Sequence, residues 1–189
     1  MRIRAFKYLS PLIVYMLTVI SFSQTGWLTF LPVIYAFGAI PLIELWQRPD
    51  PKNLDTASEE LIRRDPVYDY ILYCFVLLQY GALAYFLFSI SELQSDLLSM
   101  AGRVATMGLL CGSFGINIGH ELGHRSTRFE QFLAKASLLT SLYMHFFIEH
   151  NKGHHKRVAT YDDPGTARRG ESVYLFWVRA IPVSYTHLT

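Results

Sequence analysis

The chain has 189 residues, of which 51% are hydrophobic and only 17% are charged, and its mean hydropathy is +0.22. Aromatic residues account for 15%, and the whole composition is more apolar than that of an ordinary soluble domain. The net charge of +2 is small and the sequence has no basic arm, which excludes a nucleic-acid-binding protein. The composition therefore predicts an integral membrane protein.

Four apolar segments recur along the chain, at about residues 9–22, 27–46, 70–90 and 97–118. All but the first reach the roughly 20 residues that a helix needs to cross the hydrocarbon. The first follows Arg2, Arg4 and Lys7 and could instead be a secretory signal, but another apolar segment begins directly after Gly26. We therefore expect an all-α membrane protein, a transmembrane helical bundle that crosses the membrane four times in this chain.

The charges that flank these segments predict their orientation. Basic residues gather at the amino terminus and in the 47–69 loop, whereas the opposite ends carry only SQTG and the acidic SELQSD. Because positive charge is enriched on the cytoplasmic side of membrane proteins, we expect the amino terminus to be cytoplasmic. The fourth crossing then brings the GHELGHR motif, residues 119–125, to the cytoplasmic face.

The next apolar stretch, residues 132–148, does not fit a fifth crossing. It is short, carries Lys135 and His145, and has basic residues on both sides. If it crossed, the histidines before and after it would lie on opposite faces of the membrane. We expect a short or re-entrant helix that returns to the side on which it entered, within a single membrane domain over residues 1–189.

Two histidine clusters, GHELGHR and EHNKGHH, follow apolar segments. Residues four apart share one helix face, so His120 and His124 point the same way. The same spacing joins His150 and His154, while His155 points one step further round. Five imidazoles exceed the three protein ligands of a catalytic zinc, and a histidine-rich, sulfur-poor shell suits a pair of irons that activates dioxygen. We therefore predict that these five histidines are metal ligands.

Three carboxylates accompany the predicted ligands. Glu121 and Glu149 could ligate the metal, but we favour hydrogen bonds from them to ligand histidines. Asp163 precedes a proline and could orient a histidine or cap the next segment. His145 lies on the apolar approach to the second cluster and fits a buried hydrogen-bonding residue better than a ligand. We expect no catalytic residue beyond the metal ligands, and no organic cofactor.

The two clusters also resemble a known family. The segments NIGHELGHR and HFFIEHNKGHHKRVATYDDPGTARRGES resemble the first two histidine motifs, HELxH and EHxxGHH, of the integral-membrane alkane 1-monooxygenases, which are non-haem di-iron ω-hydroxylases. The resemblance runs from roughly Gly26 to Pro182. It implies a desaturase-like bundle in the bacterial inner membrane with two iron ions bound by histidines at the cytoplasmic face. It also implies hydroxylation of n-alkanes to 1-alkanols with O2 and electrons from rubredoxin, which rubredoxin reductase supplies.

The sequence departs from that family after the second motif. Family members are longer and carry further motifs of the types HSDHH and NYxEHYG, which this sequence does not contain. The resemblance therefore implies an amino-terminal fragment that lacks the remaining iron ligands and is inactive alone. The ending AIPVSYTHLT continues the family pattern poorly, and we expect its last residues not to be native.

The resemblance suggests two further roles. An acidic rubredoxin could be steered by the basic residues that follow the histidines, namely Arg125, Lys152, Lys156, Arg157, Arg168 and Arg169. The segment YAFGAIP resembles the family helix that lines the substrate channel, which makes Ala36 a candidate channel residue; its small size is equally consistent with close helix packing.

Other functions remain open at this point. A related xylene-type monooxygenase or a fatty-acyl hydroxylase or desaturase would use the same metal site. HExxH is also the motif of zinc proteases, in which Glu121 would be the general base, but that reading leaves the second cluster unused. A metal transporter would need ionisable or sulfur ligands within the spans, and the apolar segments offer almost none.

Overall fold

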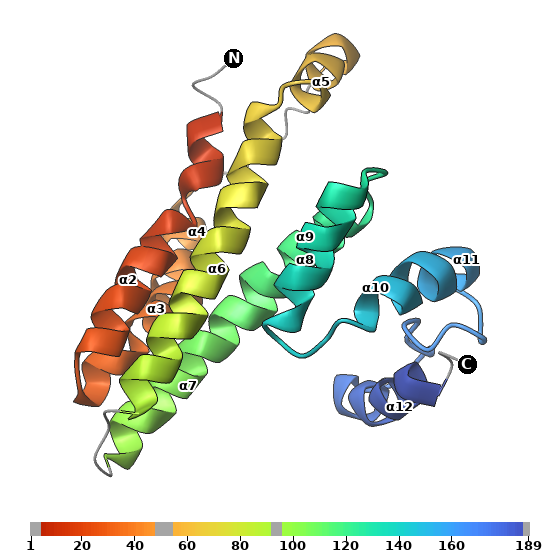
Figure 1. The fold of residues 1–189 in the computed structure, drawn as a ribbon. Coiled ribbons are helices and arrows are strands. Elements are labelled where there is room, and N and C mark those ends of the chain that lie inside the picture. Colours follow the sequence, from red (N-terminus) through yellow and green to blue (C-terminus); the bar gives the residue numbers. More distant parts are fainter. Residues whose placement is uncertain (1–4, 48–54, 92–95, 187–189) are drawn as a thin grey trace. The chain divides into compact units, whose positions relative to one another are not determined.

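The computed structural model describes residues 5–47, 55–91 and 96–186, and every regular element in these ranges is helical (Figure 1). This confirms the predicted all-α class. The chain divides into two compact units, Met1–Gly115 and Ile116–Thr189, which are described in turn. The prediction of one membrane domain over the whole chain stays a prediction.

The first unit contains most of the membrane-spanning length. Its elements are η1 (Phe6–Leu9), α2 (Leu12–Ser23), η2 (Gly26–Phe30), α3 (Leu31–Ile34), η3 (Tyr35–Ala39), α4 (Ile40–Trp46), α5 (Thr56–Arg63), α6 (Val67–Ser91), α7 (Leu97–Leu110) and η4 (Cys111–Gly115). Continuous helical stretches long and apolar enough to cross a membrane are Phe6–Ser23, Gly26–Trp46, Val67–Ser91 and Leu97–Gly123. They match the four apolar segments in order, and the last extends further than expected, through His120.

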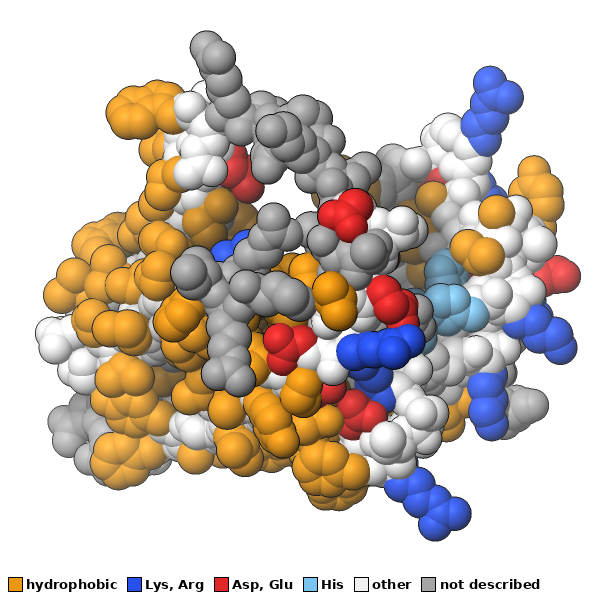
Figure 2. Space-filling model, turned by 90° about the horizontal axis from the view of Figure 1, so that it is seen from above, with side chains coloured by type: hydrophobic (Ala, Val, Ile, Leu, Met, Phe, Trp, Pro, Cys, Tyr) orange, Lys and Arg blue, Asp and Glu red, His pale blue; other side chains and the backbone are white. Residues whose placement is uncertain are grey.

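The first unit buries hydrogen-bonding side chains among its apolar core residues and exposes large hydrophobic side chains on its surface. Large hydrophobic side chains such as Leu77 and Phe88 are exposed on the spans, and Figure 2 shows hydrophobic side chains over much of one face. Inside, the Tyr15 hydroxyl donates to Gln79 Oε1 at 2.9 Å, and the Thr106 hydroxyl donates to the Thr29 carbonyl at 2.9 Å. This pattern suits a lipid solvent, in which interhelical hydrogen bonds and close packing hold helices together.

Helix α7 approaches η2 closely and carries a buried arginine. A Cβ on Gly102 would lie 1.9 Å from Thr29 Oγ1, so only glycine fits there. The next residue, Arg103, is 6% exposed. Its guanidinium donates to the Ser89 carbonyl at the end of α6 and to the Gln24 carbonyl after α2, at 2.5 and 2.7 Å. Arg103 thus ties three helix ends together near one side of the bundle.

The second unit carries both histidine clusters. Its elements are α8 (Ile116–Gly123), α9 (Arg128–Leu139), α10 (Phe146–Ile148), η5 (Glu149–His154), α11 (His155–Arg157) and α12 (Val173–Thr186). Helix α9 begins at the N-cap residue Thr127, whose hydroxyl accepts a hydrogen bond from the Glu130 N–H and donates one to the Glu130 carboxylate. The tight turn before α9 lays it alongside α8 (Figure 1).

The stretch 132–148 is divided between two helices. Helix α9 ends at Leu139, the chain turns through Leu142 at a φ of 56°, and α10 starts at Phe146. No membrane-spanning stretch was found here among the described residues, since α9 has only 12 residues. The turn returns the chain toward α8, which α10 contacts.

We expect Gly119→Ala to destabilise the second unit. The new Cβ would lie 2.7 Å from Leu138 Cγ and 3.1 Å from the Ala134 carbonyl, and Leu138 is fully buried and cannot move aside. Overpacking of this kind costs about 1–3 kcal/mol of unfolding free energy, measurable as a lower thermal midpoint in detergent. Gly108→Ala is the control, because its Cβ meets nothing within 4 Å. Equal midpoints for the two variants would show that α8 and α9 can separate freely.

Candidate metal centre

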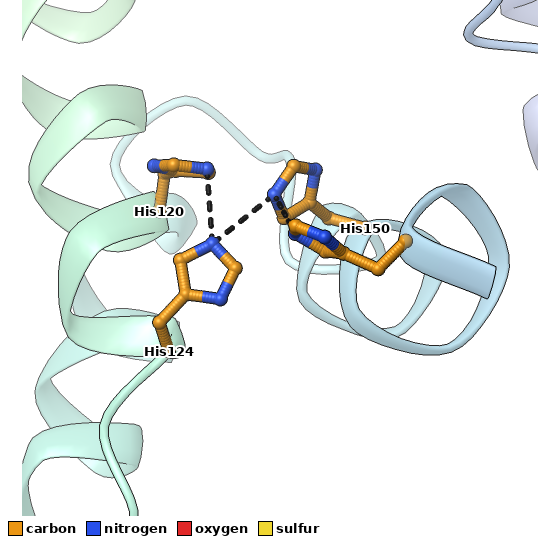
Figure 3. A group of neighbouring side chains, drawn as sticks. His120, His124 and His150 are labelled. Atoms are coloured by element: carbon orange, nitrogen blue, oxygen red, sulfur yellow. Dashed lines mark hydrogen bonds between the residues drawn. The ribbon is translucent and has the colours of Figure 1, made fainter. Parts of the chain in front are cut away.

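Four histidine rings converge in the second unit. Their candidate ligand atoms all lie within 4.8 Å of one another. The Nε2 atom of His124 is 3.1 Å from that of His120 and 3.3 Å from that of His150, which is 2.9 Å from Nε2 of His155. Figure 3 shows His120 and His124 on one helix with their rings turned toward His150 on a neighbouring segment.

These contacts cannot all be ordinary hydrogen bonds. A ring nitrogen of neutral histidine carries either one hydrogen or one in-plane lone pair, so it acts once, as donor or as acceptor. The Nε2 atoms of His124 and His150 each contact two other Nε2 atoms. Metal binding that takes up these lone pairs satisfies the arrangement better than any choice of tautomers.

Protonation is disfavoured at the middle of the cluster. Partial burial and then the neighbouring imidazoles His120, His155, His124 and His154 lower the pKa of His150 to about 4. The pKa of His124 is also lowered, mainly by burial and by His120 and His155, against an opposing effect of Glu121. Both rings are therefore neutral near pH 7, which is the form that binds a metal.

The two clusters use different helical windings. His120 and His124 lie four apart on α8, as the sequence predicted. Residues Glu149–His154 form η5, a π-helix, whose hydrogen bonds run between residues five apart. The wider turn places His155 over His150. The ring of His154 also stacks on that of His150, with centroids 5.5 Å apart, so the two residues still share one side as predicted. The π-helical winding adds the contact of His155 with His150, which α-helical spacing did not predict.

His154 has a different partner from the other four. Its Nδ1 lies 2.8 Å from Oδ2 of Asp163, a side chain that is 1% exposed. An ionised carboxylate accepts, so Nδ1 carries the hydrogen and the Nε2 lone pair stays available to a metal. Asp163 thus contacts a histidine as well as the turn that follows it, and its role in orienting a metal ligand stays a prediction.

A tight turn holds the Asp163 carboxylate. Its Oδ1 accepts from the Gly165 N–H at 2.9 Å, and its Oδ2 also accepts from the Thr166 hydroxyl. Burial raises the pKa of Asp163, but the hydrogen bonds from Thr166, Gly165 and His154 outweigh it and the net shift is downward. A Cβ on Gly165 would lie 3.1 Å from His154 Nδ1, so this position favours glycine.

Two residues that the sequence analysis did not single out support the cluster. Asn151 donates to the carbonyls of Gly123 and Phe147, at 3.3 and 3.0 Å, and so joins the second cluster to the end of α8. The ring of Phe146 stacks on His150 with centroids 4.8 Å apart. An amide inside the second histidine motif and an aromatic residue four positions before a predicted ligand were the available signals.

The remaining predicted residues lie outside the group of four. Glu121 is exposed and accepts from Arg125 at 3.2 Å. Glu149 is the first residue of η5 and His145 packs edge-on against Tyr143. Ala36 belongs to the first unit, in the π-helical stretch η3. The roles predicted for Glu121, Glu149 and Ala36 stay predictions.

The donor set fits a transition metal. It consists of imidazole nitrogens from four histidines that lie within 4.8 Å of one another, with His154 next to them. Imidazole suits iron, zinc and copper, and the group contains no sulfur ligand.

Comparison with known proteins agrees with this site. Residues 97–188 match the family model of fatty acid desaturases. The chain is 37% identical over 165 residues to alkane 1-monooxygenase 1 of Alcanivorax borkumensis, and 35% and 34% identical to the alkane 1-monooxygenases of Ectopseudomonas oleovorans and Pseudomonas putida. Each alignment covers 86% of this chain and 41% of the relative.

The fold and the histidine cluster thus define a membrane-embedded helical protein of the desaturase type with a site able to hold a metal. The chain spans about two fifths of the length of the curated relatives that it matches. Over that length it is similar in sequence to alkane 1-monooxygenases, in agreement with the resemblance of its two histidine motifs.

Proposed function

We propose that the protein to which this chain belongs is a membrane monooxygenase that hydroxylates the terminal methyl group of n-alkanes to give 1-alkanols. The observation that carries this proposal is the convergence of four Nε2 atoms from His120, His124, His150 and His155. The similarity to alkane 1-monooxygenases supports the assignment of the reaction and of dioxygen as the oxidant.

The metal would be a pair of irons, with His120, His124, His150, His154 and His155 among the ligands. When bound, such a pair supplies the binding and reductive activation of dioxygen. The chain's own residues position the ligands: Asp163 fixes the tautomer of His154, and Asn151 holds the second cluster against α8. Further ligands would come from parts of the relatives' length that this chain does not span.

The decisive experiment is product analysis with the whole protein. Membranes that contain it, together with rubredoxin, rubredoxin reductase, NADH and n-octane, should yield 1-octanol by gas chromatography. Iron should exceed zinc in the purified protein. A terminal alkene or a desaturated acyl chain as the only product would favour desaturation, and one zinc with no iron would favour the protease alternative.

The substrate has no polar group, so chain-length selection depends on the shape of an apolar channel. Ala36 lies in η3, and π-helical stretches occur frequently at functional sites. We expect Ala36→Trp to shift hydroxylation toward shorter alkanes while iron content stays unchanged, because the side chain would shorten the channel. The measurement is the relative rate over a series of alkane lengths. An unchanged profile with intact metal would assign Ala36 to helix packing.

Electrons would come from rubredoxin, and the protein would lie in the bacterial inner membrane with its histidines on the cytoplasmic side. Lys156 and Arg157 are exposed on α11 beside the metal ligands. Lys156→Glu with Arg157→Glu should raise the apparent KM for an acidic rubredoxin about tenfold at low ionic strength and less than about twofold at high ionic strength, since salt screens exposed charges. Equal effects at both ionic strengths would contradict steering by these residues.

A further inference from the structure

A small basic pocket lies in the second unit, away from the four converging rings. It has a volume of about 190 Å³ and lies between the loop that follows α11 and helix α12. Its polar lining consists of three guanidinium groups and three hydroxyl groups, from Arg168, Arg169, Arg179, Thr160, Tyr161 and Thr166. The lining contains no acidic residue.

One arginine builds the pocket wall. Arg179 donates through Nε and Nη2 to the two carboxylate oxygens of Glu171, both at 2.8 Å, and also to the Thr166 carbonyl at 3.1 Å. Hydrogen bonds from Arg179 and from the Arg168 N–H lower the pKa of Glu171 to about 2. The pair is therefore ionised throughout the neutral range and holds α12 against the loop.

The other two arginines are exposed at the mouth of the pocket. The backbone N–H of Arg168 donates to Glu171 at 2.9 Å. Arg168 is also one of the residues that line the pocket. Arg169 follows it directly and also lines the pocket. Guanidinium groups match the oxygens of a phosphate in geometry and charge.

The neighbouring helix points to the source of that phosphate. On α12, Tyr174, Trp177 and Val178 lie on one face and are 72%, 52% and 73% exposed. Phe176 and Arg179 occupy the opposite, half-buried side, where the guanidinium lies 5.5 Å from the ring centroid. An apolar face with tyrosine and tryptophan is typical of a helix at the boundary between headgroups and acyl chains.

We propose that this pocket binds the phosphate of an anionic phospholipid, whose acyl chains lie along the exposed face of α12. A pocket of about 190 Å³ admits one headgroup phosphate but not the acidic surface of a protein. A soluble phosphate compound would make no use of Tyr174, Trp177 and Val178. Under this proposal Arg168 and Arg169 bind a lipid phosphate, and they do not steer rubredoxin as the sequence analysis suggested.

The pocket also adjoins the metal-binding residues. Thr166 lines the pocket and donates to Asp163, which in turn accepts from His154. A bound headgroup would therefore stabilise the loop that contacts His154 through Asp163. The proposal itself concerns lipid binding and does not depend on the reaction that the metal supports.

Tryptophan fluorescence gives a local test. The chain has three tryptophans, and Trp27→Phe with Trp46→Phe leaves Trp177 as the reporter. In bilayers of phosphatidylcholine, brominated phosphatidylglycerol should quench Trp177 with about tenfold higher affinity than brominated phosphatidylcholine, because charge-assisted hydrogen bonds discriminate between the headgroups. Equal quenching by the two lipids would overturn the proposal.

Variants connect the selectivity to the pocket. Arg168→Gln with Arg169→Gln should abolish the preference, whereas Lys156→Gln with Arg157→Gln removes the same charge outside the pocket and should preserve it. Arg168→Lys with Arg169→Lys should retain part of it and serves as the readout if the glutamine variant unfolds. Loss of the preference in the Lys156 and Arg157 variant alone would contradict the proposal.

Two further arms separate the alternative ligands. Glycerol 3-phosphate at micromolar concentration should leave the preference unchanged, and its complete displacement of phosphatidylglycerol would identify a soluble anion as the ligand. The glutamine variant should leave the rubredoxin KM of the whole protein unchanged. A raised KM with intact lipid preference would identify a protein-docking surface and overturn the lipid assignment.

Discussion

Replacing His150 with alanine is expected to lower the iron content of the whole protein by more than about tenfold and to abolish alkane hydroxylation. His150 is central to the cluster, because its Nε2 contacts those of both His124 and His155. Its loss removes a ligand and separates the two histidine clusters. Metal analysis of the purified protein and 1-alkanol formation are the measurements.

His145→Gln is the matched control for this variant. His145 lies in the same segment as His150 but outside the group of four converging rings. The His145→Gln variant should keep its iron, provided that its thermal midpoint shows a folded protein. Equal iron loss in both variants would mean that the segment, and not the ring of His150, holds the metal.

The second large effect is expected for Asp163→Asn. Asparagine has one carbonyl oxygen and one amide group, so it cannot accept from the Gly165 N–H on one side and from His154 and Thr166 on the other. If its NH2 faces His154, Nδ1 must accept and the hydrogen moves to Nε2, where it blocks the metal. Iron affinity should fall by about 10–100-fold.

Asp162→Asn is the control, since Asp162 is the exposed neighbour of Asp163. Iron affinity is measured by competition with a chelator, and the spectrum of the bound iron reports whether the remaining ligands change. A change in His154 coordination should alter that spectrum, whereas a purely structural effect would lower occupancy alone. Unaltered affinity and spectrum in Asp163→Asn would remove its positioning role.

The carboxylate should support the site over a wide pH range. The pKa of Asp163 is lowered on folding, so its contribution is present above the pKa of an unfolded aspartate and is lost as the pH falls through the lower folded value. Near pH 7 it is ionised in both states. Acid loss of metal should therefore not require protonation of Asp163.

The sequence predicted those features that depend on local composition. Apolar length identified the four spans, and the spacing of His120 and His124 identified one face of α8. Both follow from the geometry of a regular helix, which needs no knowledge of its neighbours. The family was recognised for a similar reason, because its motifs are contiguous in sequence.

The features that were missed depend on contacts between distant residues. The π-helical winding of η5 pairs His150 with His155, and nothing in the letters EHNKGHH distinguishes it from an α-helix. The hydrogen bond from Asn151 to Gly123 spans 28 positions and exists only because the turn at Leu142 returns the chain to α8. Helical periodicity carries no information about either contact.

Arg103 has a consequence for how the protein is made. Placing an arginine among lipid tails costs about 2.5–3.5 kcal/mol at the centre of a span. Here the carbonyls of Ser89 and Gln24 accept hydrogen bonds from the guanidinium and offset this cost. Both acceptors precede Arg103 in the chain, so they leave the ribosome before it does. The order of synthesis is thus the one in which carbonyl acceptors for this charge already exist when Arg103 is added to the chain.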